Sequence, residues 1–339
     1  VEQASSYLRF VAEAVLVTRL VVDQSEGLDD YIDGYLQALA AFQCGEETIL
    51  VIGDEDNGHV LIPYYESRPE SLRVVLGMYE TFIHGRDGEL NGAMPSPKVA
   101  PWRTLSESTS VLKDSGHWHS RHKIGDDTLS LYFRAGRMDF PLIPEYAPHA
   151  HCDLLSFVIA INNQPWFVDR GTYSYKLRDI SDELRLSGAH NTIMIDGFEQ
   201  MRILGPFHND RQATGRLVDV SEHSVTGEMI LANGNRTVTV VRKISLNPEK
   251  ARIEFHDVIS GLLSEGVTWL FNLHPDVEQC EDGWLRKDAM RPGFMLEGFS
   301  DIGKKAVGYS PRYGVLEDST QLWSRDGNIV SGEIEKKWS

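Results

Sequence analysis

Hydrophobic residues in the first part of the chain recur with the spacing of amphipathic helices. Apolar side chains return every three or four positions over residues 7–22 and again over residues 28–42, which predicts two helices. Pro69 opens a third segment with the same period, and Gly85 ends it. The apolar faces are wide, so we expect these helices to pack against more helices than residues 1–90 contain.

After a proline-rich linker at residues 91–105, the helical period stops. Short apolar runs follow, often about 8–12 residues apart and separated by turn residues, as is typical of an antiparallel β-sandwich. The run at residues 154–161 is apolar except for Ser156, which predicts a strand buried on both faces. We therefore expect an α+β protein with a helical segment at residues 1–90 and a large antiparallel β-sandwich at residues 106–339. The predicted strands lie at residues 129–132, 154–161, 166–168, 192–195, 237–244, 252–255 and 268–273.

Composition and charge narrow the function classes. With 339 residues, 41% of them hydrophobic, the chain is long enough to bury a sizeable core. Its net charge of −17 argues against binding nucleic acid through phosphate neutralisation. No segment approaches the roughly 18 uncharged apolar residues of a transmembrane helix, so we expect no membrane span. The cysteines are far apart and form no metal-binding pair, which predicts free buried thiols at Cys44, Cys152 and Cys280.

A group of histidines and carboxylates carries the strongest chemical signal. If residues 149–153 form a strand, the side chains of His149, His151 and Asp153 point to one face. Two imidazoles and a carboxylate suit zinc or iron(II). The residues alone leave two ligand sets open: His151 and His190 with Asp153, as in non-haem iron oxygenases, or the same histidines with Asp169. The expected hairpin after the strand mildly favours Asp153.

Three short motifs contain this group and follow one another along the chain. They are His-Ala-His-x-Asp at residues 149–153, Asp-x-Gly-Thr-x-x-Tyr at residues 169–175 and Ala-His-Asn-Thr at residues 189–192. Together they closely resemble the heparinase II/III-like polysaccharide lyases, a family that includes oligoalginate lyases. Upstream, Glu2-Gln3 followed by Tyr7 is similar to a helix motif of that family, and residues 52–58 are similar to its Gly-Asp-x-Asp-x-Gly loop.

The resemblance implies a fold and a set of site residues. The fold is an incomplete α/α toroid followed by an antiparallel β-sandwich, with residues 1–90 as the last toroid helices. One structural divalent metal, zinc, is implied at His151, Asp169 and His190. The implied catalytic residues are Tyr7, His149 and Tyr175.

The implied reaction is β-elimination on a polysaccharide that contains uronic acid. A tyrosine removes the C5 proton and a tyrosine protonates the leaving O4, while His149 helps to neutralise the uronate carboxylate. Such a tyrosine needs a lowered pKa, which a nearby cation or metal can supply. Residues 134–216 hold nine basic and ten acidic residues, so this stretch is nearly neutral in an acidic chain. Arg178 and Arg185 are our candidates for binding substrate carboxylates.

The resemblance also bears on completeness and partners. The family uses an Asn or His from an earlier toroid helix, and this sequence has no counterpart of it. We therefore expect the chain to begin inside a larger fold and to be inactive alone. The implied partner is an acidic polysaccharide, with neither nucleic acid nor membrane, and the implied location is periplasmic or secreted. The alternative functions are a metal-containing sandwich that binds an anionic polysaccharide without cleaving it, and the iron oxygenase.

Three further groups have ordinary structural explanations. We expect His117, His119 and His122 to be packed or exposed strand residues rather than metal ligands. Residues 54–58 are acidic but lack the spacing of a calcium loop, which predicts a capped turn. Four tryptophans are expected in the sandwich core rather than on a sugar-binding surface: Trp118, Trp166, Trp269 and Trp284.

Overall fold

The structure is a computed structural model of the chain. Its described residues are 4–22, 28–45, 48–58, 60, 72, 75, 77–78, 108–138, 149–210, 213–261, 266–281, 283–287, 294–299, 302–326 and 329–335. These residues form mostly antiparallel β-sheet, with helices at Ser5–Val21 (α1), Leu28–Ala40 (α2) and Arg178–Arg185 (α4) and a short 3₁₀ turn at Ser187–Ala189 (η3).

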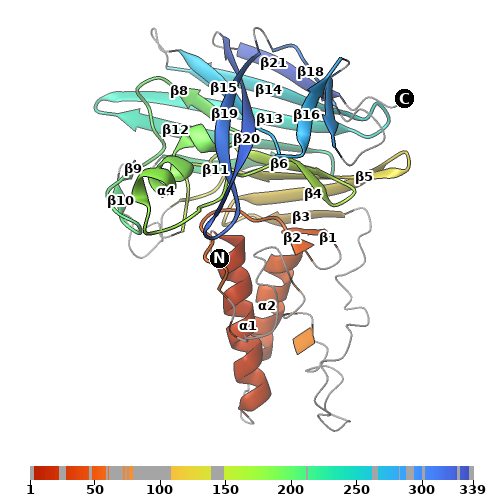
Figure 1. The fold of residues 1–339 in the computed structure, drawn as a ribbon, viewed down its shortest axis with the longest axis vertical. Helices are drawn as coiled ribbons and strands as arrows, with labels where there is room; N and C mark the ends of the chain where they lie inside the picture. The colour runs from red at the N-terminus through yellow and green to blue at the C-terminus, as the bar shows by residue number, and fades with distance from the viewer. Residues whose placement is uncertain are drawn as a thin grey trace.

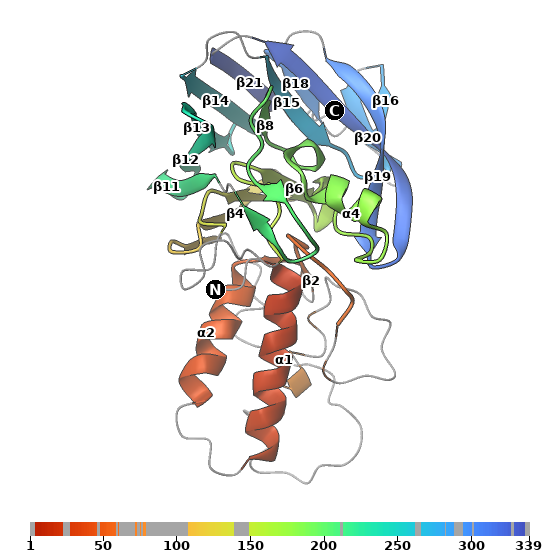
Figure 2. The ribbon, with the colours of Figure 1, turned by 90° about the vertical axis from the view of Figure 1, so that its left-hand side faces the viewer.

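Helices α1 and α2 lie side by side and extend from one end of the β-rich body (Figure 1, Figure 2). Both predicted helices are therefore confirmed. Helix α2 ends before the expected residue 42, because Leu50 N donates to the Phe42 carbonyl and the chain turns into a small hairpin. That hairpin comprises β1 (Gln43–Gly45) and β2 (Thr48–Ile49). The third predicted helix and the linker lie largely outside the described residues, so the domain boundaries and the toroid stay predictions.

Within the described residues, three larger sheets make up the β-rich body, and all of their pairings are antiparallel. The five-stranded sheet contains β3 (Ser108–Leu112), β4 (His117–Ile124), β5 (Asp127–Arg134), β6 (Phe157–Ile161) and β7 (Gln164–Phe167), in that order. The six-stranded sheet has the order β11 (Thr214–Val220), β12 (Ser224–Asn233), β13 (Arg236–Asn247), β14 (Arg252–Ser260), β21 (Ile329–Glu335) and β18 (Met295–Glu297). The four-stranded sheet has the order β19 (Gly303–Arg312), β20 (Val315–Asp326), β15 (Val267–Asn272) and β8 (Ile193–Ile195). Two small ribbons pair β9 (Arg202–Ile203) with β10 (Asn209–Asp210), and β16 (Val277–Cys280) with β17 (Gly283–Arg286).

One hydrophobic core joins the three larger sheets. Strands β5, β6, β12, β13, β14, β15 and β20 all contribute side chains to it. Along β14 buried and exposed residues alternate, as expected for a strand with one face on the core and the other in water. Each of the seven predicted strand runs overlaps an observed strand, and the packing of sheets on a shared core is consistent with a sandwich.

Strand β6 lies between two cores, which confirms the prediction that it is buried on both faces. Phe157 and Ile159 point into the sandwich core. Val158, on the opposite face, joins Tyr132 of β5 and the apolar faces of α1 and α2 in a second core. The helices therefore pack directly on the five-stranded sheet, and the two parts of the chain share a buried boundary.

The segment before β6 differs from the expectation of a continuous strand. Residues 149–156 are irregular, and β6 begins at Phe157 rather than at residue 154. His149 and Leu155 have φ angles of 66° and 60°, which interrupt an extended backbone. Because side chains of an irregular segment do not alternate between two faces, residues 149, 151 and 153 need not share one.

Expectations from composition are largely met. The four tryptophans are buried, with at most 7% of their surface exposed. The three cysteines are free, and Cys44 and Cys152 are buried while Cys280 is partly exposed. No helix among the described residues has both the length and the apolar character needed to cross a bilayer.

Candidate active site and metal centre

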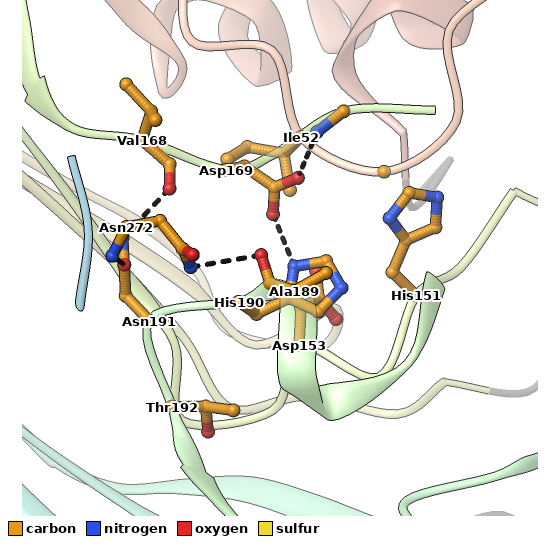
Figure 3. A network of polar contacts seen from close by, with 12 residues as sticks. Ile52, His151, Asp153, Val168, Asp169, Ala189, His190, Asn191, Thr192 and Asn272 are labelled. Carbon is orange, nitrogen blue, oxygen red and sulfur yellow. Dashed lines mark hydrogen bonds and ion pairs between the residues drawn. The ribbon is translucent and has the colours of Figure 1, made fainter. Parts of the chain in front are cut away.

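The side chains of His151, Asp169 and His190 gather in a cluster close to the helical part of the chain (Figure 3). One possible ligand atom from each residue lies within 4.8 Å of the other two. His190 Nδ1 lies 2.7 Å from Asp169 Oδ2, and the centroids of the two imidazole rings are 5.3 Å apart. The structure thus brings together the three residues implied as metal ligands, while their role as ligands stays a prediction.

The residues that follow His190 hold its backbone in place. Asn191 Nδ2 donates to the carbonyls of Phe157 and Val168, at 2.7 and 3.1 Å, and so ties the segment to the start of β6 and to the residue that follows β7. Thr192 Oγ1 donates to another buried carbonyl at 2.6 Å. The Asn and Thr of this motif therefore position the imidazole, since each satisfies backbone groups that would otherwise be buried without a partner.

The turn after β7 orients Asp169. Gly171 N donates to Asp169 Oδ1 at 3.0 Å, and the φ angle of Gly171 is 77°. A Cβ at this glycine would lie 2.3 Å from the Ser310 carbonyl oxygen, so no other residue fits without a shift. Thr172 Oγ1 accepts a hydrogen bond from Glu55 N at 3.0 Å, which links the turn to the loop after β2.

Asp54 joins the cluster, although the sequence analysis placed it only in a capped turn. Its Oδ1 lies 2.9 Å from His151 Nε2, and its backbone N donates to the His149 carbonyl at 3.0 Å. Gly53 makes this approach possible: its φ angle is 74°, and a Cβ there would lie 2.7 Å from the same His149 oxygen. The Gly-Asp pair was the available signal, but 97 residues separate Asp54 from His151 and no local pattern reports such a contact.

Several buried atoms of the cluster favour a bound cation. In the described part of the chain, His151 Nδ1, His190 Nε2 and Asp54 Oδ2 are buried and have no hydrogen-bond partner. Burying such atoms unpaired is costly, and coordination of a divalent metal satisfies them. Imidazole and carboxylate donors suit zinc and similar borderline metals. The residues present therefore fit the implied metal.

The pKa shifts of Asp54, Asp169 and His151 favour the forms that can bind a cation. Burial raises the pKa of the Asp54 and Asp169 carboxyl groups, but interactions with the neighbouring histidines outweigh it, so both pKa values lie below the ordinary range. Burial lowers the pKa of His151, although the Asp54 carboxylate opposes this shift. Ionised carboxylates and neutral imidazoles are the forms that coordinate metals.

Asp153 makes a different contact from the one its spacing favoured. Its carboxylate forms a buried ion pair with Arg134 at the end of β5. Since residues 149–156 are irregular, Asp153 and His151 interact with different partners. Among the described residues, the metal-compatible group that contains His151 includes Asp169 rather than Asp153. The geometry therefore favours the ligand set of His151, Asp169 and His190, and gives no support to the oxygenase-type set with Asp153.

A half-buried layer of rings adjoins the cluster. The Tyr7 ring, from α1, stacks on His149 with centroids 3.8 Å apart and an angle of 10° between planes. The hydroxyls of Tyr7 and Tyr175 lie 3.1 Å apart, and Tyr7 also donates to Asp56 Oδ2 at 2.9 Å. Phe207 packs against the edges of this layer. The structure thus brings together the three residues implied as catalytic, which stay a prediction in that role, and adds Asp56.

The pKa values of the two tyrosines run opposite to the expectation for a catalytic phenol. Burial is the main cause that raises the pKa of Tyr7 above its usual value, and the Asp56 and Asp54 carboxylates add to it. Burial, followed by Asp54, raises the pKa of Tyr175 in the same way. Both phenols are therefore protonated in the free chain at neutral pH. The charged groups nearby are carboxylates, which raise the pKa of a phenol, whereas the expected cations would lower it.

The two candidate substrate arginines differ in their surroundings. Arg178 is 45% exposed at the start of α4 and pairs with Asp182 at 2.8 Å. Arg185 is buried, and its guanidinium donates to the carbonyls of Ala150, Gly205 and Pro206. Substrate binding by either stays a prediction, and the contacts of Arg185 favour a role in holding the chain next to His149 and His151.

His117 and His119 are packed strand residues, as expected, and the backbone of residues 54–58 forms the expected capped turn. His117 lies in β4 and its Nδ1 is 2.7 Å from the Tyr132 hydroxyl. His119 is buried, and burial lowers its pKa to about 3. Residues 54–58 form a capped turn in which Asp56 Oδ1 accepts a hydrogen bond from Gly58 N at 2.8 Å.

Comparison with known proteins identifies the family. The family model described as "Heparinase II/III-like, C-terminal" matches residues 104–324. Because the match spans more than half of the chain, the protein belongs to this family, which confirms the resemblance seen in its motifs. No curated relative matches the chain.

Solved structures with the same fold include a heparinase III and a heparan sulfate lyase. A heparinase III with methylated lysines superimposes with a TM-score of 0.67 and 13% sequence identity. The matched region covers 100% of this chain and 52% of the heparinase chain. The heparan sulfate lyase HepC from Pedobacter heparinus has a TM-score of 0.66 and 10% identity, with the same coverage. The two TM-scores show a shared fold, and at identities this low they show the fold alone. The chain spans about half the length of either structure.

Proposed function

We propose that the protein is part of a polysaccharide lyase that cleaves a uronic-acid-containing acidic polysaccharide by β-elimination. The observation that carries the proposal is the meeting of Tyr7 with His149 and Tyr175. One residue comes from a helix and the other two from segments that flank the five-stranded sheet, and all three are partly accessible. The two hydroxyls and the Asp56 carboxylate form a continuous chain of hydrogen bonds along which a proton can move.

In this mechanism the imidazole of His149 offsets the charge of the substrate carboxylate, which makes the adjacent C5–H more acidic. The Tyr7 oxygen takes the C5 proton while its own proton passes to Asp56 Oδ2, 2.9 Å away. The Tyr175 hydroxyl protonates O4 as the C4–O4 bond breaks. The proton held by Asp56 then returns through Tyr7 to Tyr175, whose oxygen is 3.1 Å from that of Tyr7. The raised pKa of Tyr7 is compatible with this scheme because Asp56 accepts its proton.

The His151, Asp169 and His190 cluster holds zinc in this proposal. When bound, the ion supplies fixed coordination that satisfies the unpaired imidazole nitrogens. Asp54 and the turn at Gly171 orient two of the ligands from outside, as second partners of metal ligands commonly do. His149 lies two positions before His151 and is positioned by the same segment.

We further propose that the 339-residue chain alone has little activity. The carboxylate-neutralising Asn or His of an earlier toroid helix has no counterpart in this sequence, and loss of one such donor lowers rates about 10²–10³-fold. Residues 1–90 would then complete a toroid whose other helices form the rest of the substrate cleft.

The test is the release of unsaturated uronate, followed by its ultraviolet absorbance, from alginate-, heparan- and hyaluronan-type polymers. A full-length protein with the earlier helices should release it, and Tyr7→Phe should lower the rate about 10²–10⁴-fold. Tyr31→Phe is the matched control, because this tyrosine on α2 is 66% exposed. Full activity of Tyr7→Phe, or no release from any polymer, would contradict the proposal. Binding of a polymer without release would favour the non-catalytic alternative.

A further inference from the structure

A second group of potential metal ligands lies where β4 of the five-stranded sheet meets the β11–β12 hairpin. His122 comes from β4, while Glu222 and His223 lie in the turn between β11 and β12. One possible ligand atom of each residue lies within 4.8 Å of the other two. None of the three belongs to the cluster around His151, and the proposed lyase chemistry makes no use of them.

The two imidazoles have the separation expected of ligands to one ion. His122 Nε2 and His223 Nδ1 are 3.2 Å apart, and the ring centroids are 4.3 Å apart. Two nitrogens bound to the same tetrahedral zinc, at about 2.0–2.1 Å each, lie about 3.3 Å from one another. The distance between the two nitrogens therefore suits a shared cation. His122 Nε2 also lies 2.6 Å from Ser120 Oγ and 3.1 Å from the Glu222 carbonyl oxygen, and the cation would replace these contacts.

The turn that carries two of the residues is fixed before any ion binds. The Glu222 carbonyl accepts hydrogen bonds from Thr109 Oγ1 at 3.1 Å and Ser120 Oγ at 2.7 Å. Trp118 Nε1 donates to the Ser221 carbonyl at 3.1 Å. These bonds attach the backbone of the turn to β3 and β4, so residues 222 and 223 are held next to His122. Such preorganisation lowers the conformational entropy that binding must remove.

The group is also open to solvent and surrounded by negative charge. His122 is buried, whereas Glu222 and His223 are exposed at the edge of a cleft of about 660 Å³. Glu249 and Glu254 line the same cleft. Their carboxylates raise the local concentration of cations, and the opening leaves room for water as a further ligand.

We propose that His122, Glu222 and His223 bind a second divalent cation of the zinc type. Two imidazoles and one carboxylate supply three ligands, and water takes the fourth position. This donor set matches zinc sites that keep one position open. The ion links the β11–β12 turn to β4, two elements about 100 residues apart in the chain.

The experiment is a calorimetric titration of the metal-free 339-residue chain with Zn²⁺. The wild-type chain should bind two equivalents, one at each cluster. His223→Ala should lose one equivalent, because the Kd for Zn²⁺ at this site should rise at least about 100-fold. Mutation of a residue that only hydrogen-bonds to a metal ligand already weakens metal binding about 10–100-fold. Glu222→Gln should weaken the same equivalent and leave the other unchanged. Both side chains are exposed, so the circular dichroism spectra of the variants should match that of the wild type.

His256→Ala is the matched control, since this exposed histidine on β14 belongs to neither group of potential metal ligands. It should retain two equivalents. If His223→Ala binds as much Zn²⁺ as the wild type with the same Kd, the second site does not exist. A single wild-type equivalent that disappears in Asp169→Asn would also overturn it. A single equivalent that disappears in His223→Ala would instead support this site and contradict the zinc site of the proposed lyase.

Discussion

Two buried polar groups of this protein are built in contrasting ways. In the sandwich core, Arg242 forms a bidentate pair with Asp257, with both distances 2.9 Å, and a third guanidinium nitrogen donates to the Leu155 carbonyl at 3.0 Å. Trp269 Nε1 donates to the same carboxylate at 2.7 Å. The three guanidinium nitrogens of Arg242 and both carboxylate oxygens of Asp257 therefore all have a protein partner.

The cluster around His151 is equally buried but incompletely paired. His151 Nδ1 and His190 Nε2 have no partner among the described residues, and the same is true of Asp54 Oδ2. Burial with full hydrogen bonding stabilises one conformation, whereas burial with unpaired donor atoms keeps coordination positions available for a ligand. The contrast separates a structural network from a candidate functional one without reference to sequence motifs.

The largest expected effect comes from breaking the paired network. Arg242→Met leaves the Asp257 carboxylate buried without its cation and should reduce the free energy of unfolding by about 3–5 kcal/mol. Urea denaturation of the metal-free protein measures it. Arg216→Met is the control, because Arg216 pairs with Glu228 on the surface, where the loss should be small. Equal effects for the two variants would show that the buried pair has no special importance.

Glu55, next to Asp54, is a buried carboxyl group like Asp257, and it should make the stability of the fold depend on pH. Burial raises its pKa to about 7 from 4.5. Because the folded-state pKa is the higher one, ionisation destabilises the fold, and stability is lost as the pH rises from about 4.5 to 7. The loss should reach about 3 kcal/mol above pH 7. Glu55→Gln should remove this pH dependence, measured by urea denaturation between pH 5 and 8.

The exposed variant Glu317→Gln is the control for this experiment, and it should retain the pH dependence of the wild type. An identical pH profile for wild type and Glu55→Gln would show that this carboxyl ionises normally in the fold.

The incompletely paired cluster should respond to metal. Zinc at 100 times its Kd should raise the free energy of unfolding by about 2.7 kcal/mol, and a chelator should reverse the gain. In Asp169→Asn the gain from this cluster should disappear, because the variant has lost a charged ligand. Thermal unfolding with and without chelator measures it, in a His223→Ala background so that only this cluster contributes. A chelator response that persists in Asp169→Asn would place the ion elsewhere.

The smallest effect concerns the loop that delivers Asp54. Gly53→Ala and Gly197→Ala both place a Cβ on a backbone with positive φ, which costs roughly 1–2 kcal/mol. At Gly197 the Cβ meets no atom within 4 Å, while at Gly53 it meets the His149 oxygen. Denaturation should therefore show a greater loss for Gly53→Ala. Equal losses would indicate that the loop yields to the added methyl group without disturbing His149.

Periodic features of the sequence predicted much of the fold. Helices α1 and α2 and the strand runs follow from regular apolar spacing, because burial of one face requires that spacing. The motifs also selected His151, Asp169 and His190, which the structure brings together. Strand geometry mildly favours Asp153 instead, because a tight hairpin after a strand at residues 154–161 would not place Asp169 opposite His151.

Contacts across long separations were beyond the sequence. Asp54 meets His151 because two positive-φ residues, Gly53 and His149, bend their segments toward each other. Asp56 reaches Tyr7 through the same loop. His122, expected to be an ordinary strand residue, meets His223 because a distant hairpin folds over β4. Each of these contacts depends on tertiary packing, and no local pattern encodes it.

The loop at residues 52–58 has a consequence for protein engineering. It belongs in sequence to the helical part, yet it supplies Asp54 to His151 and Asp56 to the pair of tyrosines. Homologous parts therefore cannot be recombined simply at the linker. A chimera that takes its β-rich body from another family member should also take residues 52–58 from that member, because this loop contacts the β-rich body.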